Sequence, residues 1–299
     1  MLKRTIEISS QPTHLSMRHG QITLSRDGEP IGSVPCEDVG TVVVDHPQTT
    51  YTHAVLRDIV AQGGTVVICG HDHQPAGVLI PLGSHCQIVQ RTREQIEATL
   101  PTRKRIWQQL IQGKISEASR VLEGLDSGKR LRALVRQVRS GDPTNVEARA
   151  AKLFWQSWLP NEVAFRRDHD GDDFNGLLNY GYAIIRALIS RAIVSAGYAP
   201  AIGIHHHHRG NPFCLSDDLI EPLRPLVDGC VRGLFLAGHF EINRNTKTRL
   251  LGLLNLTTEL GGEHGPLNVV VHRYVNQFGA CLRGETKTLD YPKRATPWN

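Results

Sequence analysis

The stretch LGSHCQIVQRT, residues 82–92, divides the chain into two parts with different patterns of apolar residues. In the first part, short β-branched runs are separated by Gly, Pro and Asp, which is typical of strands joined by tight turns. One segment, residues 51–64, instead places Val55, Ile59 and Val60 at helical spacing and ends in two glycines. This part therefore predicts a small β-rich domain with one helix. The strand-like runs are TIEISS, HLSMRHGQITLSR, PIGSVP, TVVVDH, TVVICG and AGVLIPLG.

In the second part, apolar residues recur with the 3.6-residue period of a helix over much longer stretches. The sequence thus predicts an α+β protein, with a β-rich domain in residues 1–84 and a larger, mostly α-helical domain in residues 103–285. We expect residues 85–102 to form a linker. Residues 286–299 are polar and contain proline, so we expect a loosely held tail.

Two domains also agree with the length of 299 residues, because a domain usually takes ~100–200 residues. The apolar fraction of 40% and the charged fraction of 21% are those of an ordinary globular protein. We find no apolar run near the ~20 residues that cross a bilayer and no secretory signal, so we expect a cytoplasmic protein. The six cysteines form no CxxC pair, so we expect free thiols rather than disulfides.

The net charge of +5 is unevenly distributed, because basic residues concentrate between residues 101 and 140. Ten Lys and Arg stand there against three acidic residues, which leaves a local charge of +7. Such a stripe suits a phosphate backbone, but a solvated helical face gives the same pattern, and the sequence leaves both interpretations open. The basic residues are Arg103, Lys104, Arg105, Lys114, Arg120, Lys129, Arg130, Arg132, Arg136 and Arg139.

The segment GIHHHHRGNPFCLSDDLIEP, residues 203–222, holds four consecutive histidines followed by Asp217, Asp218 and Glu221. On a helix the three carboxylates share roughly one face, and Pro222 predicts a kink around Glu221. Carboxylates clustered near imidazoles are costly unless a cation neutralises them, and this donor set suits Mg²⁺ or Mn²⁺. The alternative is an acidic helix start that faces solvent, since Asp favours a helix N-terminus anyway.

Glu147 is a second candidate, at the start of the helix predicted from NVEARAAKLFW. The pattern Thr144-x-x-Glu147 matches a capping box, which we prefer on the residues alone. Asp142 followed by Pro143 offers an alternative start for the same helix.

Three segments in order, EARAAKLFW, LLNYGYAIIRALISRAI and GIHHHHRGNPFCLSDDLIEPLRPLVD, closely resemble the CRISPR-associated spacer-acquisition integrases, the Cas-one protein family. The resemblance covers essentially the whole chain and is best to type II members. It implies that Glu147, His206 and Glu221 bind a divalent metal. His206 ends the family's Gly-x-x-His tetrapeptide, with His205 as the reserve, and Asp218 falls on a commonly acidic position that supports the ligands or adds a metal contact.

The resemblance also implies the activity: a DNA integrase and endonuclease, dependent on Mg²⁺ or Mn²⁺, in which a 3′-hydroxyl of a short duplex attacks a phosphodiester of a CRISPR array. Its partners are double-stranded DNA (prespacer and repeat), the Cas-two protein and a second copy of the chain, with the β-rich domain as the dimerisation domain. Two alternatives remain, a stand-alone metal-dependent nuclease acting on branched DNA and a non-catalytic nucleic-acid-binding module. The candidate DNA contacts are Arg103, Lys104, Arg105, Arg132, Arg136 and Arg139.

Overall fold

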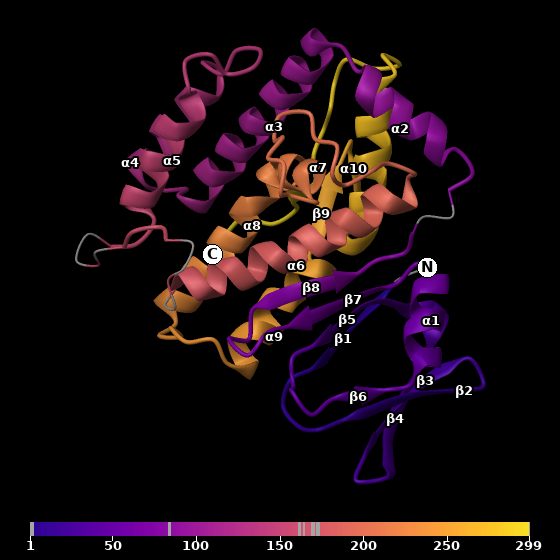
Figure 1. Cartoon of the computed structure of the whole chain (residues 1–299). Coiled ribbons are helices and arrows are strands. Elements are labelled where there is room, and N and C mark those ends of the chain that lie inside the picture. The colour runs from indigo at the N-terminus through magenta and orange to yellow at the C-terminus, as the bar shows by residue number, and fades with distance from the viewer. Residues whose placement is uncertain are drawn as a thin grey trace.

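A computed structural model describes residues 3–82, 85–160, 163, 165–168, 171 and 174–298 of the chain, and it confirms the α+β class (Figure 1). The first part contains two four-stranded sheets and the one expected helix, α1 (His53–Ala61). One sheet has the order β1-β5-β7-β8, in which β8 is antiparallel to the other three strands. The other has the order β4-β3-β2-β6. The strands are β1 (Arg4–Ile8), β2 (His14–Arg18), β3 (Gln21–Arg26), β4 (Glu29–Pro35), β5 (Val39–Val44), β6 (Thr50–Tyr51), β7 (Thr65–Cys69) and β8 (Pro75–Leu79).

The central strands β5 and β7 of the β1-β5-β7-β8 sheet are parallel and are covered on both faces, which explains their continuous valine runs. Val42 and Val66 face a small core formed within the first part of the chain. Their neighbours Val43 and Val67 point to the opposite face and join the main core of the helices. The sheet therefore packs directly on the helical part of the molecule.

The helical part surrounds α6 (Phe174–Ser195), nearly all of which is buried. Contrary to our expectation, this helix is long and apolar enough to cross a membrane by length and composition, but 83% of its most apolar window is buried inside the protein. It therefore behaves as the core helix of a folded domain. The other helices are α2 (Ile88–Glu97), α3 (Leu100–Val121), α4 (Asp126–Val135), α5 (Val146–Ser157), α7 (Cys214–Leu219), α8 (Arg224–Leu236), α9 (Arg244–Gly252) and α10 (Leu267–Leu282), with 3₁₀ turns η1 (Cys36–Asp38), η2 (Glu221–Leu223) and η3 (Leu253–Asn255).

A third sheet, which the sequence did not predict, lies within the helical part. It has the order β10-β9-β11, from β9 (Thr257–Leu260), β10 (Glu263–Pro266) and β11 (Lys293–Arg294). Strand β11 belongs to residues 286–299, the tail that we expected to be loosely held. Much of this tail instead packs on the protein: β11 pairs with β9, Leu289 is buried and Trp298 packs against the main core.

The expected end of the β-rich domain, residue 84, lies outside the described residues. The span that we expected as a linker, 85–102, contains α2 and the start of α3. All six cysteines lie in the described ranges and are free thiols, as expected.

Candidate functional site

Glu221 lies at a break between two helices, as its proline neighbour predicts. Helix α7 ends at Leu219, η2 carries Glu221, Pro222 and Leu223, and α8 then begins at Arg224. The break turns the Glu221 side chain inward, where its exposed fraction is only 5%. A carboxylate at this depth needs cationic partners.

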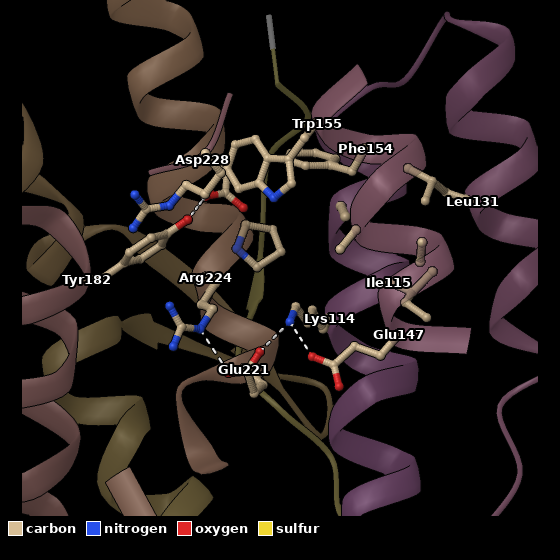
Figure 2. Close-up of a pocket in the computed structure, with 15 residues that line it drawn as sticks. Lys114, Ile115, Leu131, Glu147, Phe154, Trp155, Tyr182, Glu221, Arg224 and Asp228 are labelled. Carbon is tan, nitrogen blue, oxygen red and sulfur yellow. Dashed lines mark hydrogen bonds and ion pairs between the residues drawn. The ribbon is translucent and has the colours of Figure 1, made fainter. Parts of the chain in front are cut away.

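Lys114, from the middle of α3, supplies one of those partners and joins two distant parts of the sequence. Its Nζ atom lies 2.6 Å from Glu147 Oε1 and 2.6 Å from Glu221 Oε2 (Figure 2). The first contact is a hydrogen bond. The second is an ion pair with the buried carboxylate. The two predicted carboxylates therefore meet at one ammonium group.

Arg224 is the second cation on Glu221, with its Nε atom 2.9 Å from Oε1. Burial raises the pKa of Glu221, but the Arg224 guanidinium and the Lys114 ammonium outweigh it and hold the pKa at about 2. Burial likewise lowers the pKa of Lys114, but Glu221 and Glu147 outweigh it and raise the pKa above its usual value. Glu221, Lys114 and Arg224 are thus all charged at neutral pH.

Glu147 reaches Lys114 because other residues cap its helix. The Asp142 carboxylate accepts hydrogen bonds from the backbone N–H groups of Val146 and Glu147, both at 2.9 Å, and the Asn145 side chain accepts one from Ala148. The capping box with Thr144 that we preferred is therefore wrong, and so is the alternative start at Asp142-Pro143: the helix begins at Val146 with Asn145 as its N-cap, and Asp142 contributes two further hydrogen bonds to the first turn. The Glu147 side chain is left free to face α3.

Asp218 organises the histidine segment instead of joining the two glutamates. Its buried carboxylate accepts hydrogen bonds from the backbone N–H groups of Ile204, His205 and His206, and lies 2.8 Å from His206 Nδ1. This hydrogen bond to Asp218 raises the pKa of His206. Because Nδ1 is engaged, Nε2 is the His206 nitrogen that remains for a ligand.

His205, the reserve candidate, is used in packing. Its ring stacks on Trp107 with centroids 3.8 Å apart and an angle of 3° between the planes. Burial lowers the pKa of His205. His206 meets the same tryptophan edge-on and keeps a side chain that is 40% exposed. The geometry therefore favours His206 over His205 as the ring that can reach a ligand.

Two cavities adjoin these residues on either side of Arg224 and Tyr182. One, of about 250 Å³, is lined by Lys114, Glu147 and Glu221 together with an apolar wall from α3, α4, α5 and α8. The other, of about 380 Å³, is lined by His206 and by polar residues that include Arg186 and Asn179. The predicted ligands are thus shared between neighbouring cavities.

Within the described ranges, no group of three or more His, Cys, Asp or Glu side chains is close enough together to hold a metal ion as the side chains stand. The donor types nevertheless fit Mg²⁺ or Mn²⁺, since two carboxylates and an imidazole are available. Glu221 Oε2 is buried and already contacts a cation, the Lys114 ammonium at 2.6 Å, so this position suits a positive charge. The ammonium of Lys114 stands where the two carboxylates meet.

The predicted basic stripe divides into structural and exposed residues. Arg103 donates to the carbonyl oxygens of Gln95 and Ile96 at the end of α2, and the Nε atom of Arg105 is buried. The other candidate DNA contacts, Lys104, Arg132, Arg136 and Arg139, are exposed.

Sequence reasoning missed the role of Lys114, which we counted only as part of the basic stripe, and it missed Arg224, Tyr182 and Asp228. Arg224 had a signal, because it lies three residues after Glu221, a spacing that places side chains side by side on a helix. Lys114 had none, since no local pattern indicates that it turns inward.

The comparisons with known proteins give a consistent picture. The family model described as CRISPR associated protein Cas1 matches residues 6–255. A CRISPR-associated endonuclease Cas1 from Neisseria meningitidis serogroup C (strain 8013) is 32% identical over 285 residues, which is 93% of this chain and 92% of the relative. A solved casposase bound to integration product is similar with a TM-score of 0.79 at 18% identity, over 99% of this chain and 94% of the casposase. A chain of a Cas6-RT-Cas1–Cas2 complex gives a TM-score of 0.78 at 16% identity, over 98% of this chain and 36% of the other.

Proposed function

This chain belongs to the CRISPR-associated Cas1 family, and on that premise we propose that it is a metal-dependent integrase that inserts short DNA duplexes into a CRISPR array. The single observation that supports a catalytic centre is the meeting of Glu147 and Glu221 at one cation, although 74 residues separate them in the sequence. We propose that Glu147, Glu221 and His206 hold Mg²⁺ or Mn²⁺. We also propose the type II affiliation, on the sequence resemblance.

When bound, the metal would act as a Lewis acid that polarises the phosphodiester and makes an alkoxide easier to form. The side chains of this chain do the rest. Glu147 and Glu221 supply anionic oxygens, and Arg224 keeps Glu221 ionised through the contact at Oε1. Asp218 holds the Nδ1 side of His206, which orients Nε2 toward a ligand. Arg186 and Arg224, which line the cavity beside His206, are placed to contact phosphate oxygens.

The reaction proposed for this site is transesterification. The 3′-hydroxyl of the incoming duplex attacks a phosphodiester at the border of a repeat, a new phosphodiester forms, and the displaced 3′-oxygen leaves with a proton. If water replaces the attacking hydroxyl, the same site cleaves DNA, so we propose endonuclease activity as well. No covalent enzyme intermediate is required.

We propose double-stranded DNA, a Cas2 protein and a second copy of this chain as partners. The similar structures of a casposase with its integration product and of a Cas1–Cas2 complex support the first two. We keep residues 1–84 as the proposed dimerisation domain and residues 103–285 as the proposed catalytic domain. Because both DNA substrates belong to the genome or to invading DNA, we propose that the protein acts in the cytoplasm.

The test is a strand-transfer assay with a labelled duplex and a plasmid that carries repeats, using Glu147→Ala and Glu221→Ala. Loss of the metal should reduce transfer by at least about 100-fold, since metal ions supply several kcal/mol of transition-state stabilisation. DNA binding, measured by fluorescence anisotropy, should change little. Unchanged transfer in both variants would refute the site.

The products also separate the alternatives. Joined DNA identifies an integrase, cleavage alone a stand-alone nuclease, and binding without either a non-catalytic module. Among the histidines, His206→Ala should impair transfer far more than His205→Ala or His207→Ala. If His205→Ala has the larger effect, then the wrong ring has been assigned to the metal.

A further inference from the structure

We propose that Lys114 is a resident counter-ion of the metal site, which holds Glu147 and Glu221 together before metal binds and competes with the divalent ion for them. This inference rests on the proposed metal site and deepens it: Lys114 would set the concentration of metal at which the site is occupied. It assigns to Lys114 a positioning role in place of the DNA contact that its place in the basic stripe suggested.

The first argument is geometric. Any cation that contacts both carboxylates must lie between them, and Lys114 Nζ lies there, 2.6 Å from one oxygen of each. These are contact distances for a charged pair, so they leave no room for a second cation at the same point. A divalent ion that binds both glutamates therefore has to displace the ammonium.

The second argument concerns charge. Glu147 and Glu221 contribute two negative charges, and Lys114 and Arg224 contribute two positive charges, so this group is neutral without metal. The cations come from α3 and α8, and the anions from α5 and η2 (Figure 2). A divalent ion beside an undisplaced ammonium would meet strong repulsion in a buried site. Without Lys114, in contrast, the group would carry a net negative charge that attracts the metal and destabilises the metal-free protein.

The third argument is that Lys114 can leave without taking the ligands apart. On Glu221 it contacts Oε2, while Arg224 holds the other oxygen, Oε1. The four-carbon stem of a lysine is flexible, and Lys114 lines the cavity of about 250 Å³ that also contains the Asp228 carboxylate. The cavity gives the ammonium both space and an acceptor. Glu221 would keep its orientation through Arg224 during the exchange.

The experiment compares Mn²⁺ binding by the full chain and by Lys114→Met, which retains the length of the side chain without its charge. Free Mn²⁺ is measured by electron paramagnetic resonance in the absence of DNA. Lys114→Met should bind Mn²⁺ about tenfold more tightly, which corresponds to ~1.4 kcal/mol. Its melting temperature in EDTA should fall below that of the wild type, and its rise on adding Mn²⁺ should be larger. Lys152→Met, an exposed lysine on the helix that carries Glu147, is the matched control and should bind Mn²⁺ like the wild type.

Other results would contradict either the competition by Lys114 or the metal site itself. If Lys114→Met binds Mn²⁺ as weakly as the wild type or more weakly, the competition is wrong. If Lys114→Met does not fold, Lys114→Gln and Lys114→Arg replace it: competition requires the glutamine variant to bind more tightly than the arginine variant, and equal affinities would refute it. If Glu147→Gln and Glu221→Gln leave the Mn²⁺ affinity of the wild type unchanged, the proposed metal site itself is wrong.

Discussion

The buried carboxylate of Asp228 lies close to the proposed catalytic group without touching either glutamate. It accepts a hydrogen bond from the Tyr182 hydroxyl, and its backbone carbonyl accepts one from Trp158 Nε1 at 3.0 Å. Burial raises the pKa of Asp228 to about 7, although the hydrogen bond from Tyr182 works in the opposite direction. Tyr182 in turn lies under the Arg224 guanidinium, 4.8 Å from the ring centroid. Asp228 thus sits behind the arginine that holds Glu221.

This pKa predicts a pH dependence of stability. Between the ordinary value of 3.8 and about 7, the folded protein keeps a proton that the unfolded chain releases. The contribution of Asp228 to the free energy of unfolding is therefore greatest at low pH and falls as pH rises through this window. Asp228→Asn does not titrate and can still accept from Tyr182. Relative to the wild type it should gain about 1–2 kcal/mol between pH 5 and pH 7, measured from urea unfolding.

The control for this experiment is Asp27→Asn, the same chemical change at an exposed turn residue with a φ of 48° that asparagine also adopts. It measures what the Asp-to-Asn change alone does to the unfolding curves at each pH. A constant difference between Asp228→Asn and the wild type from pH 5 to pH 8 would mean that Asp228 is ionised throughout.

Individual residues were predictable to the extent that a motif names them. Glu147, His206 and Glu221 came from the family resemblance, and the structure places the two glutamates on one ammonium. The choice between adjacent histidines needed the tertiary structure, because His205 stacks on Trp107, about one hundred residues earlier, whereas the His206 ring is held by Asp218. The inward direction of Lys114 was equally invisible, since Lys104 on the same helix belongs to the same basic stripe and is exposed, whereas Lys114 is half-buried.

At the scale of an element, the start of α5 positions Glu147, which we propose as a metal ligand. Asp142 accepts from two of the unpaired N–H groups of its first turn, one of them that of Glu147. Asp142→Ala should therefore reduce the free energy of unfolding by about 1–2 kcal/mol, because it removes both hydrogen bonds. It also places an alanine, which disfavours positive φ, at a position where φ is 46°. It should also lower DNA transfer. Urea unfolding and the strand-transfer assay measure the two effects.

Thr144→Ala is the matched control, because it removes the hydroxyl of the capping box that does not form. Thr144 is exposed, so the substitution should leave stability within about 0.5 kcal/mol of the wild type. Equal losses from the two substitutions would show that the helix start in solution differs from the one described.

The basic segment provides a second prediction at this scale. Arg136 and Arg139 are exposed just after α4, whereas Arg103 donates to two carbonyl oxygens of α2. Arg136→Ala with Arg139→Ala should weaken binding to any DNA duplex and reduce the slope of log K against log salt by about 0.9 for each phosphate that these arginines neutralise. Arg103→Ala should lower stability instead. Binding titrations at several salt concentrations check the slope, and an unchanged slope in the double variant would exclude both arginines from the phosphate backbone.

Elements with a strong period were predictable, and short ones were not. Helix α1 and the strands of the first part follow from period and turn residues, except the two-residue strand β6, whose Tyr51 we had placed in the predicted helix. The third sheet was not predicted, because its strands have only four, four and two residues, too few to establish a period. The pair Gly261-Gly262, both with positive φ, was nevertheless a hairpin signal between β9 and β10. Strand β11 pairs with a partner more than thirty residues earlier, which no local pattern indicates.

At the scale of the whole molecule, a buried ion pair connects the β-rich part to the helices. Asp45, just after β5, pairs with Lys247 of α9, and both side chains are at most 5% exposed. His73 lies 3.0 Å from the same carboxylate, and Tyr180 of α6 faces the Lys247 ammonium at 5.5 Å. Val43 and Val67 already share the helical core, so this ion pair adds a buried polar contact to one that apolar burial supplies.

Removing one partner of that pair should therefore be far more damaging than removing both. Lys247→Met leaves the Asp45 carboxylate buried without its main cation, and breaking a buried pair in this way costs about 3–5 kcal/mol. The combination of Asp45→Asn with Lys247→Met removes both charges and should recover much of that loss. Urea unfolding of the two single variants and the double variant measures the coupling. Lys129→Met, at an exposed position of α4, provides the control for the chemical change. If the single and double variants are equally destabilised, then packing alone holds the two parts of the molecule together.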